Sequence, residues 1–186
     1  MEIQKKLQEW KQMNQDYLER IKFMVQNINS ATNPLIISYF TYSLQMNHDI
    51  SQSNYILGSF HIQNIGNQPL NNLHICIKMK TESYFEFSGK YVHQNSKQSL
   101  RLSSFWERIN EDSDQNEYWL KPVQKFVLKP SESLSFANFQ VKWVPKGAYS
   151  AFIDGFVYGE EISEGIRSLN QIHINGIIPE KKEVES

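Results

Sequence analysis

The sequence predicts a mainly β fold: an antiparallel immunoglobulin-like β-sandwich preceded by one N-terminal heptad α-helix. Three observations lead to this prediction. Apolar residues repeat in heptads near the N-terminus, short aromatic and β-branched runs follow Pro34, and no later amphipathic stretch is long enough to cross over between parallel strands. We therefore expect an amphipathic, coiled-coil helix over residues 1–30, a sandwich over 34–178 and a disordered tail over 179–186.

The N-terminal repeat has the spacing of a seam between helices. From Ile3 onward, seam residues follow one another at alternating steps of four and three. Asn14 falls at an a position, where two amides can hydrogen-bond across a parallel dimer. The sequence thus favours a parallel homodimer whose oligomerisation residues are Leu7, Trp10, Asn14, Tyr17, Ile21, Met24 and Ile28.

A second interpretation of the helix stays open. Trp10 and Tyr17 are bulkier than the leucine usually preferred at d positions, and apolar residues beside the seam widen its face. A wide apolar face also suits a helix that docks on its own sandwich.

Beyond Pro34, nine short runs are candidate strands separated by turn residues, close to the seven to nine strands of an immunoglobulin-like sandwich. In the second and third runs, apolar and polar residues alternate, which predicts one buried and one wet face for each strand. Ile56, Phe60 and Ile62 oppose Ser59, His61 and Gln63, and Leu73, Ile75, Ile77 and Met79 oppose His74, Cys76, Lys78 and Lys80. The candidate strands are residues 35–44, 55–64, 72–80, 84–87, 118–120, 125–128, 134–144, 148–158 and 169–175.

Two short segments carry a resemblance to a known family. The segment with Asn64-Ile65-Gly66 and Pro69 between two strands resembles bacterial immunoglobulin-like repeats such as the CARDB group. The run Leu128-Lys129-Pro130-Ser131-Glu132-Ser133 is similar to the Leu-x-Pro-Gly-Glu-Ser turn of those domains, with Ser131 where Gly is usual. The resemblance implies a sandwich fold and an adhesion or spacer role, and it carries no catalytic residues.

Composition narrows the classes of partner. Lys and Arg number 19 against 20 Asp and Glu, so a net charge of -1 provides no general field for nucleic acid or an anionic membrane. The single cysteine, Cys76, has no partner for an internal disulfide, and no segment has the apolar run of a signal peptide or membrane span. We expect a cytoplasmic protein with no membrane insertion.

Possible chemical sites are sparse in the sequence. His61, His74 and Cys76 would share a wet face if the second and third strands formed a hairpin, but no fourth ligand is evident, and we expect no metal and no cofactor. Adjacent acids such as Glu160 and Glu161 diverge and rarely form a catalytic pair. Glu111, Asp112, Asp114 and Glu117 lack the ordered spacing of a calcium loop, which favours a solvated loop.

Residues 88–121 interrupt the strand rhythm, and aromatic residues gather around this insertion. Rings of this kind bind sugars or peptides by stacking, although sandwich cores use aromatic residues at a similar density. The candidate ligand-binding residues are Tyr84, Tyr91, Trp106 and Trp119.

Together these features predict a non-enzymatic assembly or scaffold protein. It would self-associate through its helix and present the sandwich to an unknown protein partner. The alternative is a carbohydrate- or peptide-binding module whose helix docks on its own sandwich.

Overall fold

The structure, a computed structural model, describes residues 34–47, 51–81, 85–93, 105–111, 113–114, 116–145 and 147–177, with the isolated positions 11, 15, 18 and 19. The seven predicted oligomerisation residues and the predicted tail at 179–186 lie outside the described residues. The heptad helix therefore stays a prediction.

The described chain is mainly β and forms two large sheets. The smaller one has the strand order β1-β2-β10-β5 and comprises β1 (Ile36–Gln45), β2 (Asn54–Asn64), β10 (Ser133–Trp143) and β5 (Glu86–Ser88). The larger one has the order β12-β11-β4-β8-β7-β6, and β13 also pairs with β11. Its strands are β4 (His74–Thr81), β6 (Tyr91–His93), β7 (Trp106–Arg108), β8 (Glu117–Pro122), β11 (Ala148–Gly159), β12 (Ile162–Arg167) and β13 (Ile172–Ile177).

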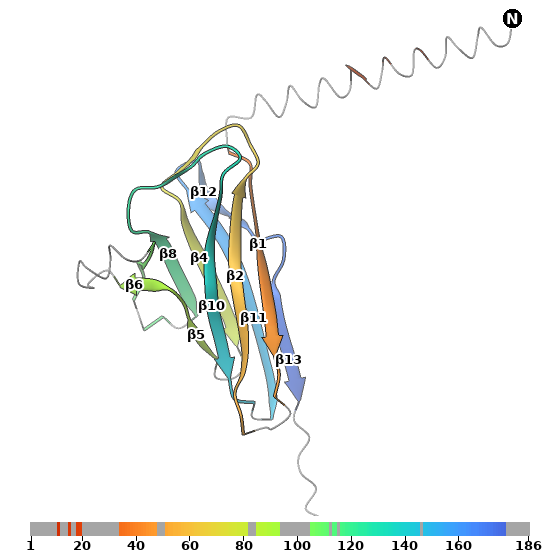
Figure 1. Cartoon of the computed structure of the whole chain (residues 1–186), viewed down its shortest axis with the longest axis vertical. Coiled ribbons are helices and arrows are strands. Elements are labelled where there is room, and N and C mark those ends of the chain that lie inside the picture. Colours follow the sequence, from red (N-terminus) through yellow and green to blue (C-terminus); the bar gives the residue numbers. More distant parts are fainter. Residues whose placement is uncertain are drawn as a thin grey trace, which may run out of the picture.

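The two sheets stack as layers with one apolar core between them (Figure 1). Alternate residues of each strand point into this core because successive side chains of a strand face opposite sides. Phe60 and Phe136 of the smaller sheet and Ile77 and Ile153 of the larger one are fully buried there. Gly155 of β11 leaves room for Phe60, because a Cβ atom on Gly155 would lie 2.4 Å from that ring.

The predicted alternation on β2 is confirmed, and on β4 it holds with one exception. On β4 the inward residues are buried, while His74 and Lys78 of the other face are partly exposed. Cys76 was predicted on a wet face, but it is fully buried. Its neighbours in register on β8 and β11 are the aromatic residues Trp119 and Phe156.

The predicted antiparallel pairing holds for the other strand pairs of the described chain but not for one. β6 and β7 pair in parallel, in register from Tyr91 opposite Trp106 to His93 opposite Arg108. Parallel neighbours need a crossover of about a dozen residues, and the insertion is long enough to supply it. This part of the predicted insertion therefore extends the larger sheet beyond β8.

The two segments that carry the family resemblance contact one another through Asn64. Its buried amide donates to the carbonyl oxygens of Gln68 (2.7 Å) and Leu128 (3.0 Å), and its side-chain oxygen accepts from the N–H of Gly66 at 3.0 Å. The main-chain carbonyl oxygen of Asn64 accepts a hydrogen bond from the backbone N–H of Ser131 at 2.9 Å. Next to this contact, β3 (Leu70–Asn71) pairs with β9 (Val127–Leu128).

Candidate functional site

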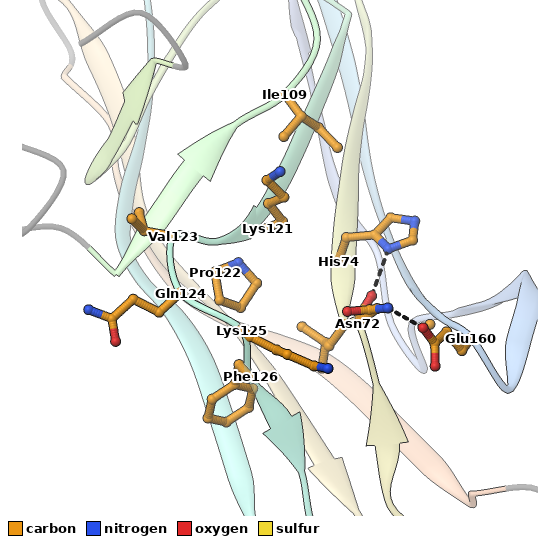
Figure 2. A pocket seen from close by; sticks show the side chains of 12 residues that line it. Asn72, His74, Ile109, Lys121, Pro122, Val123, Gln124, Lys125, Phe126 and Glu160 are labelled. Atoms are coloured by element: carbon orange, nitrogen blue, oxygen red, sulfur yellow. Dashed lines mark hydrogen bonds between the residues drawn. The ribbon is translucent and has the colours of Figure 1, made fainter. Parts of the chain in front are cut away.

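A pocket of about 500 Å³ opens beside the start of β4. Figure 2 shows residues 121–126, the end of β8 and the segment after it, along one side, with Asn72, His74 and Glu160 along the other. A volume of this size is within the range of small-molecule sites, which are commonly about 300–1,000 Å³. The lining residues are Asn72, Leu73, His74, Ile109, Lys121, Pro122, Val123, Gln124, Lys125, Phe126, Gly159 and Glu160.

One side of the pocket is fixed by two adjacent carboxylates. Glu161 accepts from the backbone N–H of Asn71 at 2.9 Å and from its side-chain amide at 2.5 Å, and Glu160 accepts from the amide of Asn72. Burial alone would raise the pKa of Glu161, but the two bonds from Asn71 lower it below the ordinary value for Glu. The adjacent acids therefore hold residues 71–72 in place, which is a structural role.

Asn72 has a left-handed backbone, with a φ angle of 49°, a conformation in which asparagine is enriched. The turn brings its carbonyl oxygen 3.1 Å from Nδ1 of His74, as Figure 2 shows. The imidazole is thereby oriented at the mouth of the pocket, with Asn72 and Glu160 beside it.

The opposite side carries two lysines. Nζ of Lys121 lies 3.8 Å from a carboxylate oxygen of Glu107, which is buried, so this cation is partly neutralised. Lys125 is exposed in the segment after β8, between Gln124 and Phe126. Pro122, Val123 and Phe126 add apolar surface, and the buried Leu73 lies on the other side of the pocket. The pocket thus combines apolar surface with both donors and acceptors.

Next to the pocket, three rings pack together on the outer face of the larger sheet. His74 stacks on Tyr158 with centroids 5.3 Å apart, and Trp119 lies 5.0 Å from Tyr158 and 6.0 Å from His74. Cys76 is paired in register with Trp119 on one side. We call His74, Trp119 and Tyr158 the ring cluster.

Cys76 is not an accessible nucleophile. Burial, with a smaller contribution from Glu117, raises the pKa of the thiol to about 12. With this pKa, almost none of the thiol is deprotonated at neutral pH. The thiolate is the reactive form, so the side chain is inert. The cysteine serves instead as a small apolar contact.

An ion pair borders the ring cluster. Nζ of Lys78 on β4 lies 2.6 Å from Oε1 of Glu117 on β8, and the indole N–H of Trp119 donates to the other oxygen of Glu117 at 2.8 Å. Both bonds favour the charged carboxylate and lower the pKa of Glu117, while the same pairing raises the pKa of Lys78. Glu117 therefore ties two strands and fixes the Trp119 ring.

The three predicted ligand-binding residues that the structure describes, Tyr91, Trp106 and Trp119, do not converge on one site. Trp119 contacts His74 at the pocket, whereas Trp106 is 4% exposed and packs within the core, its indole N–H donating to the carbonyl oxygen of Ser135 at 3.2 Å. Tyr91 is half-buried against the same core, and Tyr84 lies outside the described residues. Burial supports the packing interpretation of Trp106 and Tyr91, and only Trp119 of the described three adjoins the pocket.

The residues considered for a metal are separated by the topology. β2 and β4 belong to different sheets, so the hairpin that this grouping would have required does not form. His61 stacks on Tyr39 with centroids 5.1 Å apart on the smaller sheet, and His74 belongs to the larger one. Within the described ranges, no three His, Cys, Asp or Glu side chains are grouped as metal ligands.

The acidic segment of the insertion forms a short loop around Arg108. The guanidinium of this buried residue donates to the carbonyl oxygens of Glu111 (3.0 Å) and Asp114 (2.5 Å) and lies 4.6 Å from the centre of the Tyr118 ring. Asp114 accepts from the N–H groups of Asn116 and Glu117, both at 3.1 Å. These bonds hold the loop in shape, and Asp112 lies outside the described residues.

Sequence reasoning missed the pocket, because its residues come from four separate segments: 72–74, 109, 121–126 and 159–160. A weak signal was present in the consecutive acids after Gly159, which were considered for catalysis and instead fix residues 71–72.

Comparison with known proteins identifies no family for this chain. No protein-family model matches the chain, and no curated protein sequence matches it. Among solved structures, the ApaA protein from Bordetella pertussis is 13% identical, with 80% of this chain and 97% of that chain covered and a TM-score of 0.32. A collagen-binding domain from a Staphylococcus aureus adhesin is also 13% identical, with 75% and 95% covered and a TM-score of 0.34. None of the helical positions that the structure describes belongs to a helix long and apolar enough to cross a membrane.

Proposed function

We propose that this chain is a non-enzymatic carbohydrate-binding module whose site is the pocket between residues 72–74 and 121–126. The observation that carries the proposal is the pocket itself, a 500 Å³ recess that joins apolar surface to several polar side chains. The ring cluster at its mouth extends the surface on which a larger saccharide could lie.

The polar groups of the pocket suit hydroxyl ligands. Each sugar hydroxyl both donates and accepts, and the pocket offers donors in Lys121 and Lys125, an acceptor in Glu160, and both kinds in Asn72 and Gln124. Apolar contact from Val123 and Phe126 suits the C–H faces of a sugar ring.

The strands beside the pocket favour a saccharide over an added peptide strand. Strand addition requires a free sheet edge, where main-chain groups lack partners. β4 lies between β11 and β8, and β8 lies between β4 and β7, so both are interior strands. Recognition at this site therefore depends on side chains.

The charges favour an acidic saccharide. Glu160 is engaged by the amide of Asn72, and Lys121 lies within 3.8 Å of Glu107, whereas Lys125 is exposed at the rim of the pocket. A uronic-acid carboxylate beside Lys125 would gain a charge-assisted hydrogen bond that a neutral sugar lacks.

The immunoglobulin-like character of the sandwich is part of this proposal. In an immunoglobulin constant domain, one sheet has its first, second, fifth and fourth strands side by side and the other has its seventh, sixth and third. The orders β1-β2-β10-β5 and β13-β11-β4 match that arrangement, with β8, β7 and β6 added beyond β4. This correspondence supports the class independently of the short sequence motifs.

A glycan array of neutral and uronic-acid oligosaccharides tests the proposal with the full chain. We expect saturable binding to the acidic set, and a loss of at least tenfold in affinity for Lys125→Gln. Lys142→Gln removes an exposed lysine from β10, outside the pocket, and is the matched control. Equal affinities for both variants, or no binding to any saccharide, would overturn the proposal.

A further inference from the structure

β1 is an edge strand whose two halves differ. Along its first half, the chain between β12 and β13 bonds to three of the outward main-chain groups. Leu169 donates to the carbonyl oxygen of Ser38 at 2.8 Å, and the side chain of Asn170 accepts from the N–H of Phe40 at 2.7 Å and donates to its carbonyl oxygen at 2.9 Å. Among the described residues, no strand pairs with β1 on this side.

The second half of β1 presents the same kind of groups without this cover. In an antiparallel strand, every second residue directs both its N–H and its C=O to the same side. Because Phe40 directs both groups away from β2, Tyr42 and Leu44 do so as well. Their side chains are 46% and 48% exposed, although their partners across β2, Gly58 and Ile56, are buried.

In the part of the chain that the structure describes, this half-strand has no charge, proline or bulge to protect it against edge pairing. Proteins blunt exposed edges with charged residues, proline or bulges. β1 has the sequence Ile-Ile-Ser-Tyr-Phe-Thr-Tyr-Ser-Leu-Gln, without a charge or a proline, and its register with β2 runs unbroken over all ten residues.

We infer that residues 42–44 of β1 pair antiparallel with the same residues of a second copy of this chain. A two-fold axis at Ser43 places Tyr42 opposite Leu44 of the second copy and Leu44 opposite its Tyr42. Both of these become hydrogen-bonded pairs, so the four outward main-chain groups on each chain form four interchain bonds. The smaller sheets of two molecules would then form one continuous sheet.

The same register is self-complementary in its side chains. Tyr42 packs beside Leu44 of the other copy on the inner side of each sheet, an aromatic–aliphatic cross-strand pair. Ser43 meets its own copy on the outer side, where directly opposed Cβ atoms are about 4.5–5.5 Å apart, and a serine fits this spacing. A register centred one residue away in either direction would need Phe40, whose groups are already bonded to Asn170, or Met46, which lies beyond β1.

The test introduces a charge at Ser43, on the two-fold axis. Only a symmetric pairing centred there would bring the two copies of this charge into direct opposition. Ser43→Lys places two ammonium groups in direct opposition, and Ser43→Asp does the same with carboxylates, whereas an equal mixture places opposite charges together. Ser43 is exposed on β1, so neither variant disturbs the core. Ser133→Lys adds the same charge to an exposed position of β10 and serves as the control.

Amide hydrogen exchange of the full chain measures the protection of individual N–H groups. Association through another surface would not protect the amides of Tyr42 and Leu44. We expect the amides of Tyr42 and Leu44 to gain at least tenfold protection between 1 and 100 µM chain, in the natural protein and in Ser133→Lys. This gain should disappear in Ser43→Lys and Ser43→Asp alone and return in their mixture. Unprotected amides in the natural protein, or protection in Ser43→Lys equal to that of the natural protein, would overturn the inference.

Discussion

Ser131 adopts a φ angle of 66°, in the left-handed region where a Cβ atom is unfavourable. Glycine is usual at this position in the turn that the segment resembles, and the left-handed backbone of Ser131 fits that preference. We expect Ser131→Gly to stabilise the fold by about 0.5–1 kcal/mol, because relief of steric strain outweighs the added freedom of the unfolded chain. Urea unfolding measures the change. Ser133→Gly, on the adjacent strand β10, should instead destabilise the fold, and a loss of stability in both variants would contradict this account.

Asn64 joins the two segments that carry the family resemblance through several hydrogen bonds. Replacing it with alanine leaves the carbonyl oxygens of Gln68 and Leu128 and the N–H of Gly66 without their bonds. Buried groups left unsatisfied are costly, so we expect a loss of about 2–4 kcal/mol in unfolding free energy. Gln63→Ala, on the half-exposed face of the same strand, should cost under about 1 kcal/mol. Similar losses in the two variants would show that the Asn64 bonds contribute little.

At the scale of elements, the ion pair between Lys78 of β4 and Glu117 of β8 makes the stability of the fold depend on pH. Lys78, followed by Trp119, lowers the pKa of Glu117 in the folded state. A lowered folded pKa stabilises the protein above the unfolded pKa of 4.5, and the contribution is lost as pH falls through the lower folded value. We expect Glu117→Gln to lose less stability than the natural protein between pH 7 and pH 3.

Urea unfolding at the two pH values provides the measurement. Glu164→Gln, which removes an exposed acid from β12, is the control and should keep the acid sensitivity of the natural protein. An unchanged acid sensitivity in Glu117→Gln would mean that other carboxylates dominate the pH dependence.

The predicted N-terminal helix is an element with its own test. A heptad seam with Asn14 at an a position predicts association, so light scattering should report a larger species for the full chain than for a chain that starts at Asn33. If both are monomers, the helix does not associate between chains. Aggregation of the shortened chain alone would instead favour the helix as a cover for its own sandwich.

The sequence predicted the long strands well because burial imposes a period of two. β1, β2, β10 and β11 lie within one residue of their predicted ends. β3, β6 and β7 have two or three residues, too few for a periodic signal, and β12 is interrupted by Gly165, whose φ angle is 80°. The parallel pairing of β6 with β7 depends on a long-range contact that no local pattern records.

At the scale of the whole molecule, the sequence predicts individual strands but not which of the two sheets each strand joins. His61 on β2 and His74 on β4 are close in sequence, yet the chain crosses from one sheet to the other between them. The ring cluster and the pocket arise from that crossing, because it places β4 between β8 and β11. The clustering of aromatic residues around the insertion pointed to Trp119 as a candidate, whereas the positions of Asn72, Lys125 and Glu160 at the pocket required the assembled fold.

The most direct test of the proposed site is an NMR titration of the ¹⁵N-labelled full chain with glucuronic acid, using glucose as the neutral comparison. We predict saturable shifts at the backbone amides of Asn72, His74, Gln124, Lys125 and Phe126, with weaker binding of glucose. Phe126 and His74 should respond together, because they line opposite sides of one pocket. Shifts confined to other surfaces, or none at millimolar glucuronic acid, would contradict the account.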